Sequence, residues 1–176
     1  MRKFLAAFTL LSLTIMVSGA HAASVTIVAL GASNTYGKGR ANPGGVPQSQ
    51  AFPAQLQALL LARGIDARVI NAGIPGDTTA GMLARMDSAV PNGTRVVILQ
   101  TGGNDARAGA GGETGGNTSK IAGKLRARGI KVIMLDRPSV YAPKSTRDPD
   151  GQHYNAQGHA AIAAGLLPQV IAAIGR

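Results

Sequence analysis

Five residues of this chain have side chains and neighbours that suit acyl transfer: Ser33, Gly76, Asn104, Asp150 and His153. Ser33 follows an apolar, β-branched run, and Gly76 and Asn104 stand in glycine-containing segments after two later apolar runs. A serine hydroxyl is a poor nucleophile until a base takes its proton, and a carboxylate beside an imidazole fixes the tautomer of that base. The chemistry therefore requires a fold that gathers these five residues.

Two histidines follow residue 22, and they differ in their surroundings. His153 lies in a polar segment three residues after Asp150, and in a turn this spacing lets the carboxylate reach one ring nitrogen while the other faces outward. The same Asp-x-x-His spacing is also compatible with an ordinary loop hydrogen bond or a helix cap. His159 falls inside an expected helix, where we expect a half-exposed residue without a catalytic role.

Three groups are candidate donors to a developing oxyanion. Gly76 can bring its backbone N–H close to a substrate because it has no Cβ, Asn104 can offer its side-chain amide, and Ser33 can offer its backbone N–H. Each has a plainer interpretation as a turn or cap residue, since glycine and small polar side chains are typical of turns.

The elements that must position these residues alternate along the chain. Four short runs rich in Val and Ile do not alternate with polar residues, which predicts strands covered on both faces, at residues 25–30, 67–71, 95–100 and 130–135. Helical patterns cover residues 50–63, 78–89 with Asp77 as a possible cap, 118–128, and 155–174, the last interrupted by Pro168. We predict a three-layer α/β/α fold with an open, mostly parallel sheet of four to five strands.

The carboxyl ends of parallel strands meet at one edge of such a sheet, and ligands bind there. Ser33, Gly76 and Asn104 all follow predicted strands. Residues 109–116 and 42–50 are predicted to be loops because they are rich in glycine and polar residues.

Residues 1–22 have the pattern of a cleavable secretory signal peptide. Arg2 and Lys3 form a basic start, residues 4–17 are mostly apolar, and Ala20-His21-Ala22 is a small-residue cleavage signature. An uncleaved membrane anchor is the alternative, but a spanning helix needs roughly 20 apolar residues, and no later segment has them. We predict cleavage after Ala22, one domain over residues 23–176, and a periplasmic or secreted location.

The composition argues against several classes of function. The chain has no cysteine, which excludes disulfides and thiol chemistry. Its formal net charge of +10 favours anionic surroundings such as envelope lipids, but the basic residues are scattered and aromatic residues make up only 3%, which argues against specific nucleic-acid binding. No cofactor is indicated, and the lack of histidine pairs at ligand spacing argues against a metal site.

The chain resembles the SGNH (GDSL-type) hydrolases, a family named for a serine, a glycine, an asparagine and a histidine in four sequence blocks. The resemblance covers essentially all of residues 23–176, and its Asn-Ala-x-Ile-x-Gly-Asp-Thr string is specific. The blocks are matched, in the family order, by Gly31-Ala32-Ser33-Asn34-Thr35, Asn71-Ala72-Gly73-Ile74-Pro75-Gly76-Asp77-Thr78-Thr79, Gly102-Gly103-Asn104-Asp105 and Asp150-Gly151-Gln152-His153.

The resemblance implies a role for each candidate. Ser33 would be the nucleophile, His153 the base and then the acid, and Asp150 the residue that orients His153. The Ser33 N–H, the Gly76 N–H and the Asn104 side chain would form the oxyanion hole. The family also implies an open, flavodoxin-like sheet and no metal, and the likeness is greatest to exported bacterial lysophospholipases, thioesterases and arylesterases.

Two features depart from the family pattern. Ala32 stands where the family usually has aspartate, which we expect to loosen the site without abolishing it. Between Asp136 and Asp150, where relatives usually carry another helix and strand, this chain has only a short Pro/Ser/Arg-rich loop. The shortening favours four strands and a pocket flank that is open or completed by a partner subunit, and it leaves reduced activity as an alternative.

The sequence thus favours a secreted serine esterase that hydrolyses small to medium acyl esters or thioesters through an acyl-enzyme. A carbohydrate O-deacetylase acting on envelope or extracellular glycans is an alternative on the same fold, because fold alone does not fix the substrate. A non-catalytic binding module that kept the scaffold is the alternative from a different class. The oligomeric state is not predicted.

Overall fold

The fold is built on a parallel sheet of four strands in the order β2-β1-β3-β4. The structure is a computed structural model that describes residues 24–39 and 44–175, so the predicted signal peptide lies outside the described residues. All three strand pairings are parallel, as the sequence predicts. The strands are β1 (Val25–Gly31), β2 (Ala67–Gly73), β3 (Thr94–Leu99) and β4 (Lys131–Met134).

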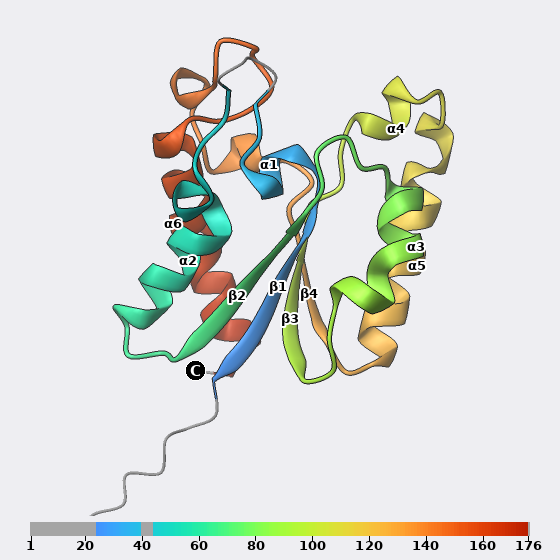
Figure 1. Ribbon diagram of the computed structural model, residues 1–176. Coiled ribbons are helices and arrows are strands. Elements are labelled where there is room, and N and C mark those ends of the chain that lie inside the picture. Colours follow the sequence, from blue (N-terminus) through green and yellow to red (C-terminus); the bar gives the residue numbers. More distant parts are fainter. Residues whose placement is uncertain (1–23, 40–43, 176) are drawn as a thin grey trace, which may run out of the picture.

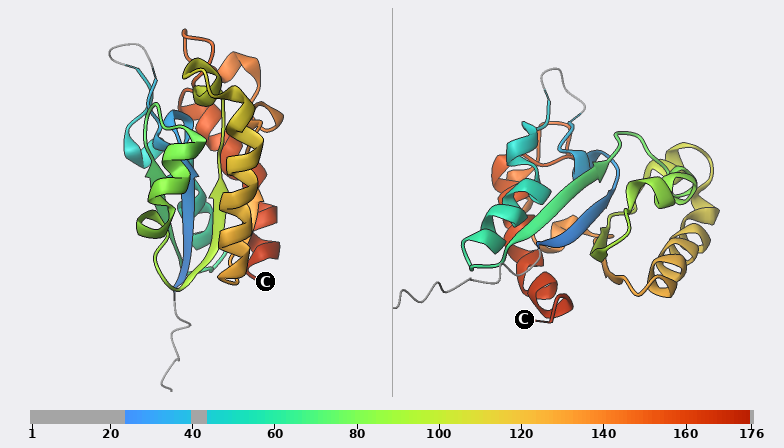
Figure 2. Two further views of the ribbon diagram at one scale, coloured as in Figure 1. Left: turned by 90° about the vertical axis from the view of Figure 1, so that its right-hand side faces the viewer. Right: turned by 60° about the horizontal axis from the view of Figure 1, so that its bottom comes forward.

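Helices cover both faces of the sheet and complete the predicted α/β/α layers (Figures 1 and 2). One face carries α2 (Phe52–Leu61) and α6 (Ala156–Ala173). The other face carries α3 (Thr79–Ala89) and α5 (Thr114–Ala127). Within the two described ranges, none of the helices is both long enough and apolar enough to cross a bilayer.

The central strand β1 explains why the predicted strands do not alternate in polarity. Ile27 and Ala29 pack into the core beneath α2 and α6, while Val28 and Leu30 pack into the core beneath α3 and α5. All four side chains are fully buried. Burying one such Ile, Val or Leu side chain contributes about 1.5–3 kcal/mol, so both faces of β1 stabilise the fold.

The sheet stops at β4, as the short connection after residue 136 predicts. Two 3₁₀ turns, η3 (Pro138–Val140) and η4 (Lys144–Thr146), replace any further strand between β4 and α6. The opposite edge strand is β2, where the Gln57 side chain accepts a hydrogen bond of 2.8 Å from the Val69 N–H.

Two helix predictions and one loop prediction need correction. Helix α6 continues through Pro168, because Leu166, Leu167 and Val170 on either side are buried and hold the two halves in line. Thr78, not Asp77, caps α3, because its hydroxyl accepts the Gly81 N–H at 3.1 Å.

The third correction concerns residues 109–116, which are not a loop throughout. Gly111–Glu113 forms the 3₁₀ turn η2, and Gly115 and Gly116 lie in the first turn of α5. The buried Asn117 donates to the Thr79 hydroxyl at 3.3 Å, and this tertiary contact overrides the low helix propensity of glycine. Of the predicted loop at 42–50, residues 42 and 43 lie outside the described residues, and Gln48–Gln50 forms η1.

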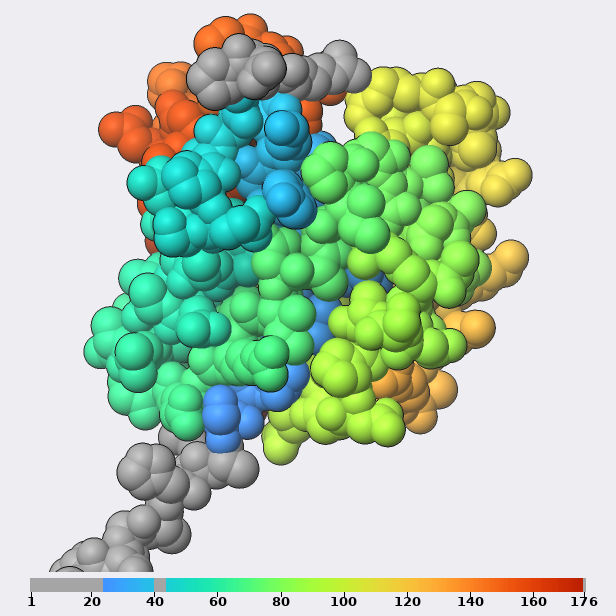
Figure 3. Space-filling view, in the orientation of Figure 1, coloured from blue at the N-terminus to red at the C-terminus, as the bar shows by residue number. Residues whose placement is uncertain are grey.

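Short elements crowd the carboxyl edge of the sheet, at the top of Figure 1. Helix α1 (Ser33–Tyr36) follows β1, and helix α4 (Asn104–Arg107) follows β3. In the space-filling view the surface is notched between the yellow segment that contains α4 and the blue segment that follows β1 (Figure 3). The predicted site residues therefore converge on the edge where parallel sheets bind ligands.

Candidate active site

Ser33, His153 and Asp150 form a continuous chain of hydrogen bonds. The Oγ of Ser33 lies 2.7 Å from Nε2 of His153, and Nδ1 of His153 lies 2.6 Å from Oδ2 of Asp150. With the proton of neutral imidazole on Nδ1, the ring donates to the carboxylate and accepts from the serine hydroxyl. The His153 side chain is 8% exposed and that of Asp150 11%, so both groups are largely removed from water.

A compact loop presents the histidine. Oδ1 of Asp150 accepts the backbone N–H groups of Gln152 and His153, at 2.8 and 2.9 Å, while Oδ2 meets the ring. Gly151 between them has a φ of 69°, a left-handed conformation that favours glycine. An antiparallel bridge between Arg147 and Tyr154 closes the base of the loop. Asp150 therefore shapes the loop and orients the ring at once.

Two glycines allow α1 to sit directly on the ends of β1 and β2. A Cβ on Gly31 would lie 2.1 Å from the Thr35 hydroxyl oxygen, and a Cβ on Gly73 would lie 2.3 Å from the Tyr36 nitrogen. Ser33 is the first residue of α1, where a backbone N–H has no acceptor within the helix. The strand end at residue 31 thus leads into a helix that begins with the serine.

Gln100 supports this serine from within the fold. Its Oε1 accepts the Ala32 N–H at 3.2 Å and the Thr35 hydroxyl at 3.1 Å, and its Nε2 donates to the Thr101 carbonyl at 3.0 Å. Ala32 is itself only 4% exposed. The segment that lacks the family's aspartate is thus fixed by a buried amide. Gln100 was not recognised from the sequence, although an amide at the end of an apolar strand was a signal.

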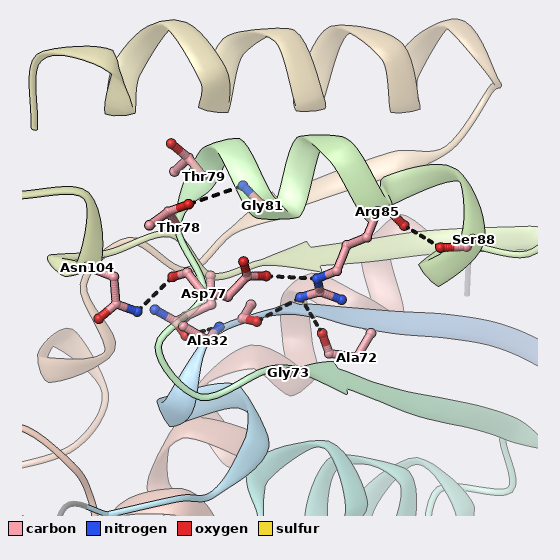
Figure 4. A network of polar contacts seen from close by, with 12 residues as sticks. Ala32, Ala72, Gly73, Asp77, Thr78, Thr79, Gly81, Arg85, Ser88 and Asn104 are labelled. Carbon is pink, nitrogen blue, oxygen red and sulfur yellow. Dashed lines mark hydrogen bonds and ion pairs between the residues drawn. The ribbon is translucent and has the colours of Figure 1, made fainter. Parts of the chain in front are cut away.

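Arg85 joins the ends of two strands to the glycine turn (Figure 4). Its Nε lies 2.7 Å from Oδ2 of Asp77, and one terminal nitrogen donates to the carbonyls of Gly31 and Ala72, at 3.1 and 2.9 Å. The carboxylate of Asp77, which the sequence suggested as a helix cap, is instead half of this ion pair. Arg85 was not recognised from the sequence, because nothing local distinguishes it from other helix-surface arginines.

Residues 74–77 form a type II turn that carries Gly76. The Asp77 N–H donates to the Ile74 carbonyl at 3.1 Å, Pro75 takes the second position, and Gly76 takes the third with a φ of 82°. Apart from Gly76 and its two chain neighbours, none of the described residues has a heavy atom within 4 Å of the place where a Cβ on Gly76 would stand. The backbone conformation, not lack of space, therefore requires glycine at this position.

Asn104 is tied to the same turn. Its Nδ2 donates to the Asp77 carbonyl at 2.7 Å, and its Oδ1 accepts a hydrogen bond from Arg107. The next residue, Asp105, is 1% exposed and accepts from both the N–H and the hydroxyl of Thr79, at 3.1 and 2.6 Å. The starts of α3 and α4 are thereby locked together, which fixes the amide of Asn104.

The five predicted residues come together as required. Ser33, Gly76, Asn104 and His153 line one cavity of about 550 Å³, and Asp150 lies behind His153. A second cavity of about 280 Å³ also reaches Ser33, Asn104 and His153. The serine therefore lines two cavities, although the chemical roles of these residues stay predictions.

His159 does not belong to this cluster, and its expected half-exposure is wrong. The residue is 1% exposed, and its Nδ1 accepts the Phe52 N–H at 3.2 Å, at the start of α2. Burial lowers the pKa of His159 to about 4. In the described part of the chain, no three His, Cys, Asp or Glu side chains gather as metal ligands would.

Comparisons with known proteins identify the family of this chain. The model of the GDSL-like lipase/acylhydrolase family matches residues 29–166. The esterase TesA of Pseudomonas aeruginosa is 39% identical over 104 residues, which are 57% of this chain and 52% of that protein. An arylesterase of Vibrio mimicus is 32% identical over 130 residues, which are 72% of this chain and 62% of that protein.

Among solved structures, the SGNH-hydrolase family esterase AlinE4 is similar with a TM-score of 0.58 and 28% identity, over 87% of this chain and 74% of that one. The match to the two curated relatives spans about half to under two thirds of their length. The family match, by contrast, runs from β1 into α6 and includes all five candidate residues. The chain belongs to the GDSL-like lipase/acylhydrolase family.

Proposed function

We propose that this chain is a serine hydrolase of carboxylic esters that works through an acyl-enzyme on Ser33. The single observation that carries the proposal is the unbroken contact from Asp150 through His153 to Ser33, at 2.6 and 2.7 Å. The names of its relatives, an esterase and an arylesterase, support the same reaction class.

In the first half-reaction, Ser33 Oγ attacks the ester carbonyl carbon while Nε2 of His153 takes the hydroxyl proton. Asp150 stabilises the resulting imidazolium. The tetrahedral intermediate then expels the alcohol, which receives the proton from His153. In the second half-reaction, water attacks the acyl-enzyme with His153 again as base, and the acid is released with Ser33 restored.

The negative charge of each tetrahedral intermediate develops on the former carbonyl oxygen, where three hydrogen-bond donors would stabilise it. The candidates are the Ser33 N–H, the Gly76 N–H and the Nδ2 of Asn104. The Ile74–Asp77 turn fixes the conformation of Gly76, and the bond to the Asp77 carbonyl fixes Asn104. Preorganised donors of this kind need no rearrangement when charge develops, which is the main source of their effect.

We assign the substrates to small and medium acyl esters or thioesters. The cavity of about 550 Å³ beside Ser33 lies within the usual range of small-molecule pockets, and the second cavity of about 280 Å³ offers room for the other half of the ester. We also propose that the protein is exported, on the signal-peptide pattern of residues 1–22. Mass spectrometry of the protein secreted by its host tests cleavage after Ala22.

A fluorophosphonate probe tests the nucleophile directly. The wild-type protein should gain the mass of one phosphonyl group, and Ser33→Ala should gain none while keeping its circular dichroism spectrum. Ser49→Ala is the matched control, because Ser49 is exposed in η1 and should leave labelling intact. A folded wild-type protein that is neither labelled nor active on p-nitrophenyl acetate, butyrate, octanoate and palmitate would favour the binding-module alternative.

The O-deacetylase alternative has less support. None of the described residues that line the two cavities is Phe, Tyr or Trp, so these walls offer no aromatic face for stacking against a sugar ring. Release of acetate from acetylated xylan, measured beside the p-nitrophenyl series, separates the two enzymes. Activity on the glycan alone would replace our proposal with the deacetylase.

A further inference from the structure

We propose that the site prefers esters that carry a negative charge, a carboxylate or a phosphate, close to the ester bond; this inference rests on the proposed function. Lys38 and Arg107 line the same cavity as Ser33 and His153. The described residues that line this cavity include no Asp or Glu. A cavity with charge of one sign attracts ligands of the opposite sign.

Arg107 is held at the wall of this cavity by neutral partners. Its terminal nitrogens donate to Oδ1 of Asn104 and, at 3.3 Å, to Oε1 of Gln152. These bonds connect α4 with the loop that carries His153. Among the described residues, no carboxylate lies within ion-pair distance of Arg107. Its guanidinium therefore keeps an uncompensated charge and free N–H groups, which suit a carboxylate or a phosphate.

Lys38 lines the same cavity and is bonded to the serine through its backbone. Its backbone N–H donates to the Ser33 carbonyl at 3.0 Å, and Lys38 and Gly45 form an antiparallel bridge. The backbone of Lys38 is thus anchored to the residue that carries the nucleophile, and Lys38 is an exposed residue that lines the cavity. The ammonium group of Lys38 is on a flexible side chain, so it can move toward an anion that is bound to the guanidinium of Arg107.

The second cavity extends the same pattern. Its described lining residues include two arginines, Arg107 and Arg147. They include one carboxylate, that of the exposed Asp136. Arg107 thus lines both cavities that contain Ser33. The anionic group can therefore belong to the acyl part or to the alcohol part of the ester, and the experiment has an arm for each.

The test compares matched pairs of charged and neutral substrates at low ionic strength. For the alcohol part the pair is 4-acetoxybenzoate and 4-acetoxybenzamide, and for the acyl part it is mono-4-nitrophenyl glutarate and 4-nitrophenyl butyrate. In at least one pair the wild-type kcat/KM for the anion should exceed that for the neutral ester by about fivefold, mainly through KM. High salt should shrink the ratio, since it screens exposed charges.

Lys38→Gln should lower the anion-to-neutral ratio by about two- to threefold. Lys124→Gln is the matched control, because it removes the same charge from the exposed side of α5 and should leave the ratio as it is. Arg107→Gln should lower the ratio further, and Arg107→Lys should restore part of it. Arg107 also holds Asn104, and a displaced Asn104 lowers kcat/KM for the charged and the neutral substrate by the same factor. This effect therefore cancels in the anion-to-neutral ratio.

Failure of this inference is distinguishable from failure of the proposed function. Hydrolysis of both neutral esters by the wild type, with no anion preference or with the same ratio in Lys38→Gln, overturns the inference and leaves the esterase proposal standing. If no ester is hydrolysed, NMR titration of the Ser33→Ala protein decides. Tighter binding of 4-acetoxybenzoate than of 4-acetoxybenzamide, weakened by salt, supports the anion site, and equal binding overturns it.

Discussion

Ser33 reaches the site at the end of β1 and is held by residues distant in the chain, whereas His153 reaches it in a loop that closes on itself. The residues around the serine are linked by Arg85 and Gln100, which bind backbone 54 and 68 residues away. Asp150 supports His153 through three contacts within three residues. The nucleophile therefore depends on the whole sheet, and the base on a short hairpin.

This difference separates two kinds of sensitivity. A change in the His153 loop should alter the chemistry while leaving the fold intact, because its hydrogen bonds are local. A change in the polar contacts beneath Ser33 should alter stability and chemistry together, because those contacts also hold the strand ends and helix starts in register. The predictions below test this contrast, beginning with the largest expected effect.

Asp150→Asn should reduce kcat roughly 10³- to 10⁴-fold with little loss of stability. An amide can keep its oxygen on the backbone N–H groups of Gln152 and His153, but it removes the charge that stabilises the imidazolium and favours the wrong ring tautomer. Single-turnover kinetics and urea denaturation measure the two effects. A large loss of stability with this variant would show that the loop is not self-contained.

His159 should make the protein less stable as the pH falls. Burial lowers its pKa from 6.5 to about 4, with His153 adding to the shift and Asp148 opposing it. Between these values the unfolded chain binds a proton that the folded chain excludes, so stability is complete above about pH 6.5 and falls as the pH drops toward 4. The full loss is about 3 kcal/mol.

Replacing His159 by Asn tests this account, because the Asn oxygen can accept the Phe52 N–H without titrating. The free energy of unfolding, measured by denaturant titration at a series of pH values, should then lose most of its slope in this window. An unchanged slope in the variant would assign the acid sensitivity to other groups.

Arg85→Met should destabilise the protein by about 3 kcal/mol, because it leaves the largely buried carboxylate of Asp77 unpaired and removes the donor to the Gly31 and Ala72 carbonyls. Arg147→Met is the matched change on the histidine side. Arg147 lies 5.2 Å from the Tyr154 ring centroid and donates to the exposed Gly151 carbonyl at 2.5 Å, and the loss of these two contacts should cost only about 1 kcal/mol.

Urea denaturation of both variants measures the difference, and the double variant Arg85→Met/Asp77→Asn should recover part of the loss because it no longer buries an unpaired charge. If Arg85→Met and Arg147→Met lowered the free energy of unfolding by similar amounts, the serine side would depend on long-range contacts no more than the histidine side does.

The sequence predicted what depends on local pattern. The Val- and Ile-rich runs identified all four strands, and residue type with position after a strand identified Ser33, Gly76 and Asn104. The spacing of Asp150 and His153 made them candidates, and the family resemblance implied their roles. The sequence did not predict the burial of His159, because its partner Phe52 is 107 residues away. Arg85 and Gln100 were missed for the same reason: a polar side chain acquires its role only when distant strand ends meet it.

The two helix caps beside the site allow the serine side and the histidine side to be compared through variants with the smallest expected effects. Thr78 caps α3 next to the Gly76 turn, and Asn155 caps α6 two residues after His153, each accepting an N–H at 3.1 Å. Either residue replaced by Ala should cost about 1 kcal/mol of stability, which urea denaturation measures.

Their effects on activity should differ. A frayed first turn of α3 moves the Asp77 carbonyl that holds Asn104, so Thr78→Ala should lower kcat several-fold. Asn155→Ala should lower it by less than about twofold, because the bridge between Arg147 and Tyr154 closes the His153 loop before α6 begins, while the cap itself is worth only about 1 kcal/mol. The reverse order of the two kcat values would mean that the histidine, and not the oxyanion donors, depends on its neighbouring helix.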